Sequence, residues 1–301
     1  MSRLQIVFLG SGPVAAKSLE LLAKNFEIET VITKPKPAHH RGEFPVIETA
    51  SQLGLKTKFV SSKSELDSII AKTKFNSRLG VIIDFGIIVS QQVIDSFPLG
   101  IVNSHFSLLP EWRGADPITF SILSGQPKTG VSLMLIDKGM DTGKLITYKS
   151  ISIMPSETTP SLTGRLINLS DELLQEYLPR YERGEITLKS QPHPDRATYS
   201  RKITKDDGLL DFTKPAEQLA REIRAYIEWP KSRTELFGKE VIITKAHSVP
   251  IDGKVGEVEI VKEAGVIVIY CSSGYLCVEK LKPAGKKEIT SDEFIRGYYK
   301  S

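Results

Sequence analysis

The sequence has only two cysteines, in the spacing C-x5-C, within a chain of 301 residues. Cys271 and Cys277 fit neither a disulfide framework nor the usual spacing of zinc ligands, so we interpret them as buried thiols. No apolar run approaches the roughly 18 residues that a membrane span requires. The apolar start leads directly into a Gly-rich turn without a cleavage pattern, which argues against a signal peptide. These absences predict a cytoplasmic protein with no membrane association.

Charge of one sign does not dominate the sequence. Forty Lys and Arg residues face 36 Asp and Glu residues, which gives a net charge of +4. This small excess permits a polyanionic partner without requiring one. The length and the 40% hydrophobic content predict roughly two domains, each with its own core.

Short β-rich runs alternate with helix-like segments in the first half of the chain. The runs cover residues 4–10, 27–33, 56–60 and 78–84. Pro13 marks a helix start, and Leu19 and Leu22 follow at helical spacing. This alternation predicts an α/β domain with a Rossmann-like, mostly parallel sheet, whose ligands bind beyond the carboxyl ends of the strands.

A polar, Pro-containing stretch separates the two halves of the chain. We interpret residues 188–206 as a linker between a catalytic domain, residues 1–187, and a second domain, residues 207–301. After the linker comes one amphipathic segment, and then glycines at nearly even spacing punctuate β-rich runs. That pattern predicts a small antiparallel β-barrel, OB-like in type.

Two short polar segments contain the residues best suited to catalysis. In NSHFSLLPEWRGADP, Asn103 and His105 end an apolar run and share one face of a strand. In DKGMDTG, two glycines mark a loop from which Asp141 can project. If the loop lies near that strand, Asn can stabilise an oxyanion, His can move a proton, and Asp can hold the imidazole. No G-x-S-x-G elbow is present, so we expect direct acyl transfer between two bound substrates.

The two polar segments together resemble the signature of the 10-formyltetrahydrofolate-dependent formyltransferases. The motifs are N-S-H-F-S-L-L-P-x-x-x-G and D-x-G-x-D-T-G, and the resemblance extends to G-x-x-P-I, WP and PAGKK along nearly the whole chain. It implies a catalytic triad of Asn103, His105 and Asp141. It also implies a turn that contacts the folate and comprises Ser107, Leu108, Leu109 and Pro110.

The resemblance further implies the reaction and its partners. The formyl group of 10-formyltetrahydrofolate passes through a tetrahedral intermediate to the α-amine of methionine on initiator methionyl-tRNA, for translation initiation. The residues expected to contact tRNA are Arg41, in the basic loop of residues 34–45, and Lys282, Lys286 and Lys287. That lysine cluster, taken alone, is also typical of a solvated turn. We expect a monomer. We also expect no metal, because the adjacent His39 and His40 lack nearby Cys or acidic partners.

Two segments depart from the family pattern. Residues 10–15 read GSGPVA in place of G-T-P-x-F-A, which puts Val14 where the family has an acceptor-side Phe. The segment that usually reads AYG is DFG, so Asp84 replaces a small residue beside the expected pterin pocket. We therefore expect the folate site to differ in its fine shape.

Three other classes of function compete with this interpretation. GSGPVA imitates the dinucleotide fingerprint G-x-G-x-x-A of an NAD-dependent oxidoreductase, but the second strand ends in Thr33 and Lys34 rather than in an acidic residue. A formyltransferase for an amino sugar nucleotide or another small amine would share the catalytic domain. A non-catalytic RNA-binding protein would use only the barrel and the basic loops, and it would leave the Asn, His and Asp set unexplained.

Overall fold

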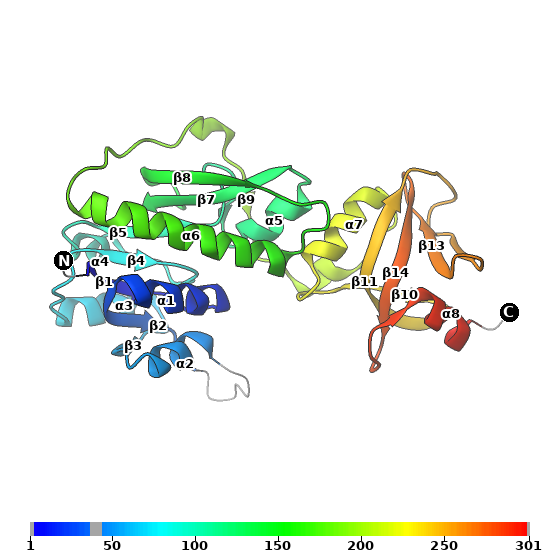
Figure 1. The fold of residues 1–301 in the computed structure, drawn as a ribbon, viewed down its shortest axis with the longest axis horizontal. Coiled ribbons are helices and arrows are strands. Elements are labelled where there is room, and N and C mark those ends of the chain that lie inside the picture. The colour runs from blue at the N-terminus through cyan, green and yellow to red at the C-terminus, as the bar shows by residue number, and fades with distance from the viewer. Residues whose placement is uncertain (1–2, 37–43, 300–301) are drawn as a thin grey trace. The chain divides into compact units, whose positions relative to one another are not determined.

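The computed structural model describes residues 3–36 and 44–299 of the chain (Figure 1). The chain forms two compact units. Unit 1 comprises residues 1–117, 128–152 and 163–200, and unit 2 comprises residues 118–127, 153–162 and 201–301. The domain boundaries expected from the sequence stay a prediction. In the described part of the chain, no helix combines the length and the apolar character that crossing a membrane requires.

Unit 1 is built on a seven-stranded sheet with the strand order β3-β2-β1-β4-β5-β7-β8. The first five strands pair in parallel, and the last two are antiparallel to their neighbours. The strands are β1 (Gln5–Leu9), β2 (Glu27–Thr33), β3 (Thr57–Phe59), β4 (Gly80–Ile82), β5 (Ile101–His105), β7 (Lys128–Leu135) and β8 (Leu145–Ser152). The predicted Rossmann-like, mostly parallel sheet is therefore confirmed.

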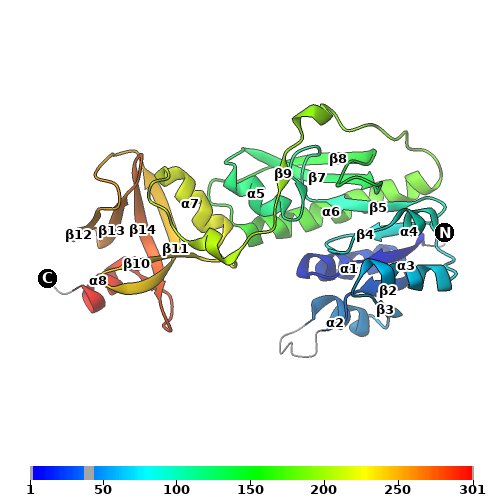
Figure 2. The same cartoon turned by 180° about the vertical axis from the view of Figure 1, so that it is seen from behind.

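Helices cover both faces of this sheet. Helices α1 (Pro13–Asn25) and α6 (Thr159–Glu182) lie on one face in Figure 1, and α3 (Lys63–Lys72) lies on the other in Figure 2. The bounds of the remaining helices are α2 (Pro45–Gln52) and α4 (Gln91–Asp95). Helix α1 starts at Pro13, where the missing N–H costs no hydrogen bond, and buries Leu19 and Leu22 as the spacing predicts.

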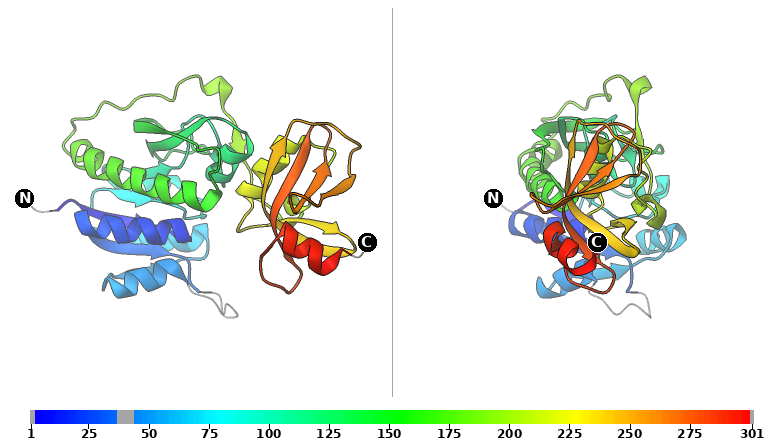
Figure 3. Two further views of the ribbon diagram at one scale, coloured as in Figure 1. Left: turned by 45° about the vertical axis from the view of Figure 1, so that its right-hand side comes forward. Right: turned by 90° about the vertical axis from the view of Figure 1, so that its right-hand side faces the viewer.

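Unit 2 contains an antiparallel sheet in the order β10-β11-β14-β13-β12, with β15 beside β14 (Figure 3). Its elements are α5 (Pro117–Leu123), α7 (Ala216–Ala225), β10 (Ser232–Leu236), β11 (Lys239–Val249), β12 (Val258–Val261), β13 (Val266–Tyr270), β14 (Tyr275–Pro283), β15 (Ile289–Thr290) and α8 (Ser291–Tyr298). The antiparallel sheet is confirmed. Among the described residues no ladder joins β10 to β12, so closure into a barrel stays a prediction.

The core of unit 2 forms where α7 and α8 pack on the sheet. Leu219 of α7 and Phe294 of α8 are fully buried among aliphatic side chains of the strands. Cys271 and Cys277 are buried in this unit as free thiols, which confirms their interpretation from the sequence.

Gly130 provides a test of how tightly unit 1 is packed beside the predicted folate turn. A Cβ at this position would lie 2.2 Å from the Lys149 carbonyl oxygen and 2.6 Å from the Leu108 side chain. We expect Gly130→Ala to lower the free energy of unfolding by about 1 to 3 kcal/mol, because the sheet must shift to admit a methyl group. Urea denaturation followed by circular dichroism measures the change.

The matched control is Gly164→Ala on α6. A Cβ there meets no atom within 4 Å, so the substitution should leave stability unchanged or raise it by about 0.5 to 1 kcal/mol. Equal destabilisation of the two variants would contradict the packing argument.

Candidate active site

Asn103 and His105 lie on β5, the strand where the parallel part of the sheet meets the antiparallel part. Asn103 faces Ile82 of β4 and Met134 of β7 in the strand register. The two polar residues alternate along the strand, so their side chains leave the same face. His105 is 5% exposed, which places its imidazole in a largely dry environment.

Asp141 reaches the same place by a different route. Because β7 runs antiparallel to β5, the loop after Leu135 starts beside Val102 and must fold back toward the end of β5. Asp137 shapes this loop, since its carboxylate accepts hydrogen bonds from the Gly139 N–H at 3.0 Å and the Thr142 hydroxyl at 2.7 Å. The backbone of Asp141 then takes a φ of +53°, in the left-handed region.

The three side chains predicted as the triad come together around the carboxylate of Asp141. Asn103 Nδ2 donates to Oδ1 at 3.4 Å, and His105 Nδ1 lies 3.7 Å from Oδ2. The backbone N–H of Gly114 donates a shorter bond to Oδ2, at 2.8 Å. The carboxylate is therefore held by one backbone donor and one side-chain donor, with the imidazole beside it.

The protonation state of His105 follows from its partners. Nε2 lies 3.1 Å from the carbonyl oxygen of Trp112, and since a carbonyl only accepts, Nε2 carries the hydrogen. Burial lowers the pKa of His105, although the Asp141 carboxylate opposes this shift by favouring the imidazolium. The neutral ring then presents the Nδ1 lone pair on the side of Asp141. That atom can accept a proton, and Asp141 would stabilise the resulting charge.

Residues from the stretch that the sequence predicts as a linker hold the Asp141 loop in place. Gln191 is buried, and its Nε2 donates to the carbonyl oxygens of Asp141 at 2.7 Å and Gly143 at 3.0 Å. Its Oε1 accepts from Nη2 of Arg113 at 2.7 Å. The short strands β6 (Arg113–Gly114) and β9 (Tyr199–Ser200) pair in parallel next to this contact. A single Gln in a polar stretch carries no sequence signal, so sequence reasoning missed it.

The turn expected to contact the folate is held by hydrogen bonds to the side chain of Ser132 on β7. The Ser132 hydroxyl donates to the Ser107 carbonyl oxygen at 2.7 Å and accepts from the Leu109 N–H at 3.1 Å. Ser107, Leu109 and Pro110 are buried, whereas Leu108 keeps part of its side chain exposed. Of the four predicted residues, Leu108 therefore offers the most side-chain surface to a ligand, and the others set the shape of the turn.

The residues predicted to contact tRNA lie in two places. Lys282 is on β14, and Lys286 and Lys287 are exposed in the turn between β14 and β15. Arg41 lies outside the described residues. The structure thus presents two lysines at the tip of a hairpin in unit 2, where a polyanion can reach them.

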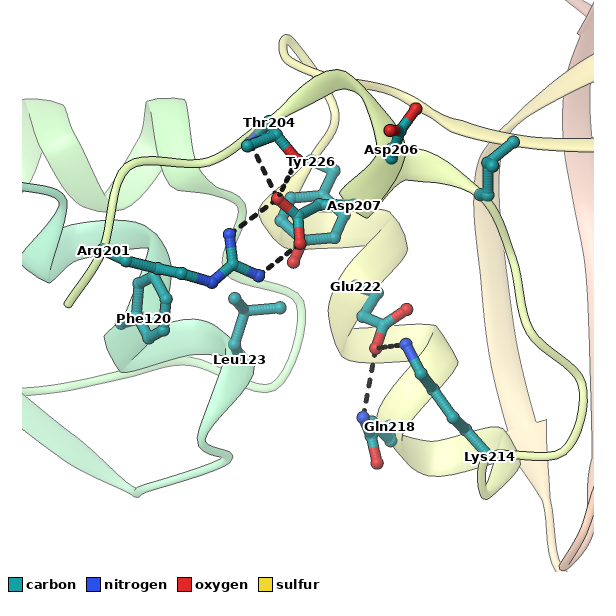
Figure 4. A pocket seen from close by; sticks show the side chains of 11 residues that line it. Phe120, Leu123, Arg201, Thr204, Asp206, Asp207, Lys214, Gln218, Glu222 and Tyr226 are labelled. Atoms are coloured by element: carbon teal, nitrogen blue, oxygen red, sulfur yellow. Dashed lines mark hydrogen bonds and ion pairs between the residues drawn. The ribbon is translucent and has the colours of Figure 1, made fainter. Parts of the chain in front are cut away.

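A cavity of about 450 Å³ in unit 2 contains none of the predicted site residues (Figure 4). Both of its positive groups are paired with carboxylates, since Arg201 pairs with Asp207 and Lys214 Nζ donates to Glu222 at 2.8 Å, and Asp206 is the remaining charged group in the lining. The Arg201 guanidinium holds the pKa of Asp207 well below its usual range. These internal pairs leave little net charge for recognising a ligand.

The expectation that the protein holds no metal stays a prediction. Within residues 3–36 and 44–299, no three His, Cys, Asp or Glu side chains gather into a group that could bind a metal ion. His39 and His40 lie outside these ranges.

We expect the pKa of His105, measured by NMR titration of the imidazole signals, to lie below the usual value for histidine. Burial disfavours the imidazolium, and this effect exceeds the attraction of Asp141. Asp141→Asn should lower the pKa further, because it removes the carboxylate that favours the charged ring. A pKa that rises in Asp141→Asn would contradict the proposed pairing.

Comparison with protein families gives two matches that together span most of the chain. Residues 4–178 match the family model of the formyl transferases, and residues 202–299 match that of the formyl transferase C-terminal domain. The methionyl-tRNA formyltransferase of Janthinobacterium sp. (strain Marseille) is 34% identical over 98% of this chain and 98% of its own length. That of Myxococcus xanthus (strain DK1622) is 35% identical over 99% of this chain and 96% of its own length.

Solved structures with lower identity share the fold. The N-formyltransferase from Helicobacter canadensis, solved with folinic acid and dTDP-3-aminofucose, is 20% identical with a TM-score of 0.68, over 92% of this chain and 99% of its own. A HypX variant from Aquifex aeolicus is 16% identical with a TM-score of 0.65, over 99% of this chain and 49% of its own. From the two family matches and the full-length relatives, the chain belongs to the formyl transferase family, among the methionyl-tRNA formyltransferases.

Proposed function

We propose that this enzyme transfers a formyl group from 10-formyltetrahydrofolate to the α-amine of methionine on initiator methionyl-tRNA. The observation that carries the proposal is the convergence of Asn103, His105 and Asp141 in a chain with full-length methionyl-tRNA formyltransferase relatives. The three residues are proposed as the catalytic triad. Contact of the turn from Ser107 to Pro110 with the folate is part of the same proposal.

The triad can supply each step of a direct transfer. The amine nitrogen attacks the formyl carbon, and the carbonyl oxygen becomes an oxyanion. Asn103 uses one N–H toward Asp141 and has a second that can donate to this oxyanion. Nδ1 of His105 accepts the proton that the amine loses, and Asp141 stabilises the imidazolium. The same proton then goes to the folate nitrogen as the carbon–nitrogen bond to it breaks, which regenerates neutral His105.

The residues near the triad fit a flat, largely apolar donor. Leu108 follows β5, and Ile88, which is 76% exposed, follows the neighbouring parallel strand β4. Ligands of such sheets bind beyond the carboxyl ends of the strands, and exposed aliphatic side chains there suit a fused ring. These two residues would contact the ring, while Asn103 and His105 meet the formyl group.

A formyltransferase acting on an amino sugar nucleotide is the second candidate. It is favoured by a likeness in fold, since one solved neighbour is WlaRD, a sugar 3N-formyl transferase, with a TM-score of 0.68 and 18% identity. The tRNA acceptor is the better supported choice, because the relatives that are 34% and 35% identical over the whole chain are methionyl-tRNA formyltransferases. An NAD-dependent oxidoreductase is disfavoured, because Lys34 rather than an acidic residue follows β2.

We further propose that the enzyme acts as a monomer in the cytoplasm. One chain carries both the proposed triad and the lysines of the β14–β15 turn, so one copy suffices for the reaction. The proposed acceptor serves translation, which takes place in the cytoplasm.

The triad is tested by alanine substitution. His105→Ala should reduce formylation of methionyl-tRNA by a factor on the order of 100 to 1000, because the reaction loses its proton acceptor. Asn103→Ala and Asp141→Ala should behave alike, and their effects should not add, since the three act as one unit. Initial rates with 10-formyltetrahydrofolate and charged initiator tRNA give the readout.

The matched control is His247→Ala, which removes an exposed histidine of unit 2. This variant should retain wild-type turnover. Near-normal turnover in His105→Ala, at an unchanged thermal midpoint, would refute the assignment.

The tRNA interaction is tested by changing Lys282, Lys286 and Lys287 together to Ala. Every phosphate that the variant no longer neutralises should flatten the slope of log affinity against log salt by about 0.9, borrowing the value for B-DNA. We therefore expect weaker binding of charged tRNA and a slope reduced by about 1 to 3, measured by filter binding across a salt series. Formylation of a small amine surrogate should survive.

The control removes three exposed lysines of unit 1, Lys63, Lys72 and Lys74, with the same change in net charge. This variant should keep the wild-type salt slope. Equal weakening of binding in both triple variants would mean that net charge, rather than the β14–β15 turn, determines binding. Loss of activity on the surrogate would mean that the turn lysines support the fold.

A further inference from the structure

The turn between β1 and α1 has the sequence of a phosphate-binding turn. Ser11 and Gly12 connect the end of β1 to a helix that starts at Pro13, as in a G-x-G-x-x-A fingerprint. The first N–H groups of a helix have no partner within the helix and carry a partial positive charge, so they commonly hold a phosphate. Ser11 and Gly12 belong neither to the proposed triad nor to the turn proposed to contact the folate.

In this protein the carboxylate of Asp84 already occupies that position. Asp84 follows β4, the neighbour of β1 in the sheet. The backbone carbonyl oxygen of Asp84 accepts hydrogen bonds from the N–H groups of Ser11 at 2.9 Å and Gly12 at 3.2 Å. A Cβ on Gly12 would lie 1.8 Å from Asp84 Oδ2, so the carboxylate fills the space that a side chain at residue 12 would need. The backbone N–H of Ala15, in the first turn of α1, hydrogen-bonds to the carboxylate.

The backbone of Asp84 supports this placement. Its φ of +47° lies in the left-handed region, which non-glycine residues adopt infrequently. Asp tolerates this region better than most residues do. A Gly or Asn at this position would relieve the strain. The presence of Asp instead indicates that its side chain has a role at the end of the helix.

Asp84 is charged under ordinary conditions. Burial raises its pKa to about 6, and the charge of Asp116 raises it too, whereas Lys34 and the Ala15 N–H favour the ionised form. The residue nevertheless keeps a solvent-exposed surface, so water can still reach it. At neutral pH most molecules therefore carry a negative charge at the N-terminus of α1.

The turn lies close enough to the triad to affect the choice of acceptor. β1, β4 and β5 are consecutive in the sheet, and Ile82, two residues before Asp84, pairs with Asn103. Neighbouring strands are about 4.8 Å apart, so two strand spacings separate β1 from β5 by about 10 Å. A small phosphorylated amine held at the α1 turn could span that distance.

We propose that Asp84 is a specificity-determining residue, whose carboxylate takes the place of a phosphate at the N-terminus of α1 and so excludes acceptors and dinucleotides that carry a phosphate there. This inference deepens the proposed function and rests on it for the identity of the acceptor. An aminoacyl ester carries no phosphate on the residue that bears its amine, whereas an amino sugar nucleotide carries a diphosphate on the sugar itself. Exclusion of phosphate therefore favours an aminoacyl ester as the acceptor.

The test is the binding of inorganic pyrophosphate at pH 7.5, measured by isothermal titration calorimetry. Wild type should bind weakly, and Asp84→Ala should bind at least about tenfold tighter, because it frees the Ala15 N–H and removes the negative charge that repels pyrophosphate. Asp84→Asn, which keeps the shape but not the charge, should fall between them. Asp95→Ala on α4 loses the same charge from an exposed site and should match wild type.

Thermal midpoints of all variants establish which of them are folded. If Asp84→Ala unfolds, Asp84→Asn decides the question by itself. Folded Asp84 variants that bind pyrophosphate no tighter than Asp95→Ala would overturn the proposal. So would wild-type protein that already binds it as tightly as the variants.

Inhibition kinetics connect the binding to the reaction. Pyrophosphate should inhibit formylation in Asp84→Ala by competing with the acceptor, at concentrations that leave wild type unaffected. Equal inhibition of wild type and variant would overturn the proposal. If the protein instead fails to formylate methionyl-tRNA, the proposed function falls, and the calorimetric result still decides whether Asp84 excludes phosphate.

Discussion

The arrangement of unit 1 depends on one partly buried carboxylate, that of Asp141, which lies next to a histidine with little access to water. A carboxylate removed from water needs hydrogen-bond donors, and Asp141 obtains them from the Gly114 backbone and the Asn103 amide. Both donors come from segments fixed by sheet pairing, since Asn103 is on β5 and Gly114 on β6. The position of the carboxylate, and through it the environment of His105, is therefore set by the sheet pairing of β5 and β6 together with the buried side chain of Gln191.

Much of this arrangement could be predicted from the sequence because it is local. The alternation of Asn103 and His105 along one strand follows from strand geometry, and the helix from Pro13 follows from its spacing and its first residue. The glycine-flanked loop DKGMDTG and then the resemblance brought Asp141 into the same set, and the structure places it beside both residues. The sequence did not indicate that β7 runs antiparallel to β5 and that the loop must therefore turn back.

Other parts of the site depend on interactions between segments that are distant in the chain. Gln191 meets the loop of Asp141 across 50 residues, and its residue type alone predicts nothing about that partner. The space beside Gly12 is a second example. The glycine-rich turn resembled a site for a dinucleotide phosphate, but Asp84, more than 70 positions later in the chain, fills that space. In both cases the information lies in which segments the sheet order brings together, and periodicity within one segment does not contain it.

The interactions of residues 191–200 limit how this chain could exchange parts with other proteins. Gln191 supports the loop of Asp141, and Ser200 pairs with Gly114, so both stabilise unit 1 while they lie just before residues 201–301, the last and longest segment of unit 2. A gene fusion that replaced everything after residue 187 would remove these supports together with the longest segment of unit 2. Recombination would keep these supports of the triad only where the new partner joins after residue 200. Residues 191–200 therefore mark the end of the catalytic module.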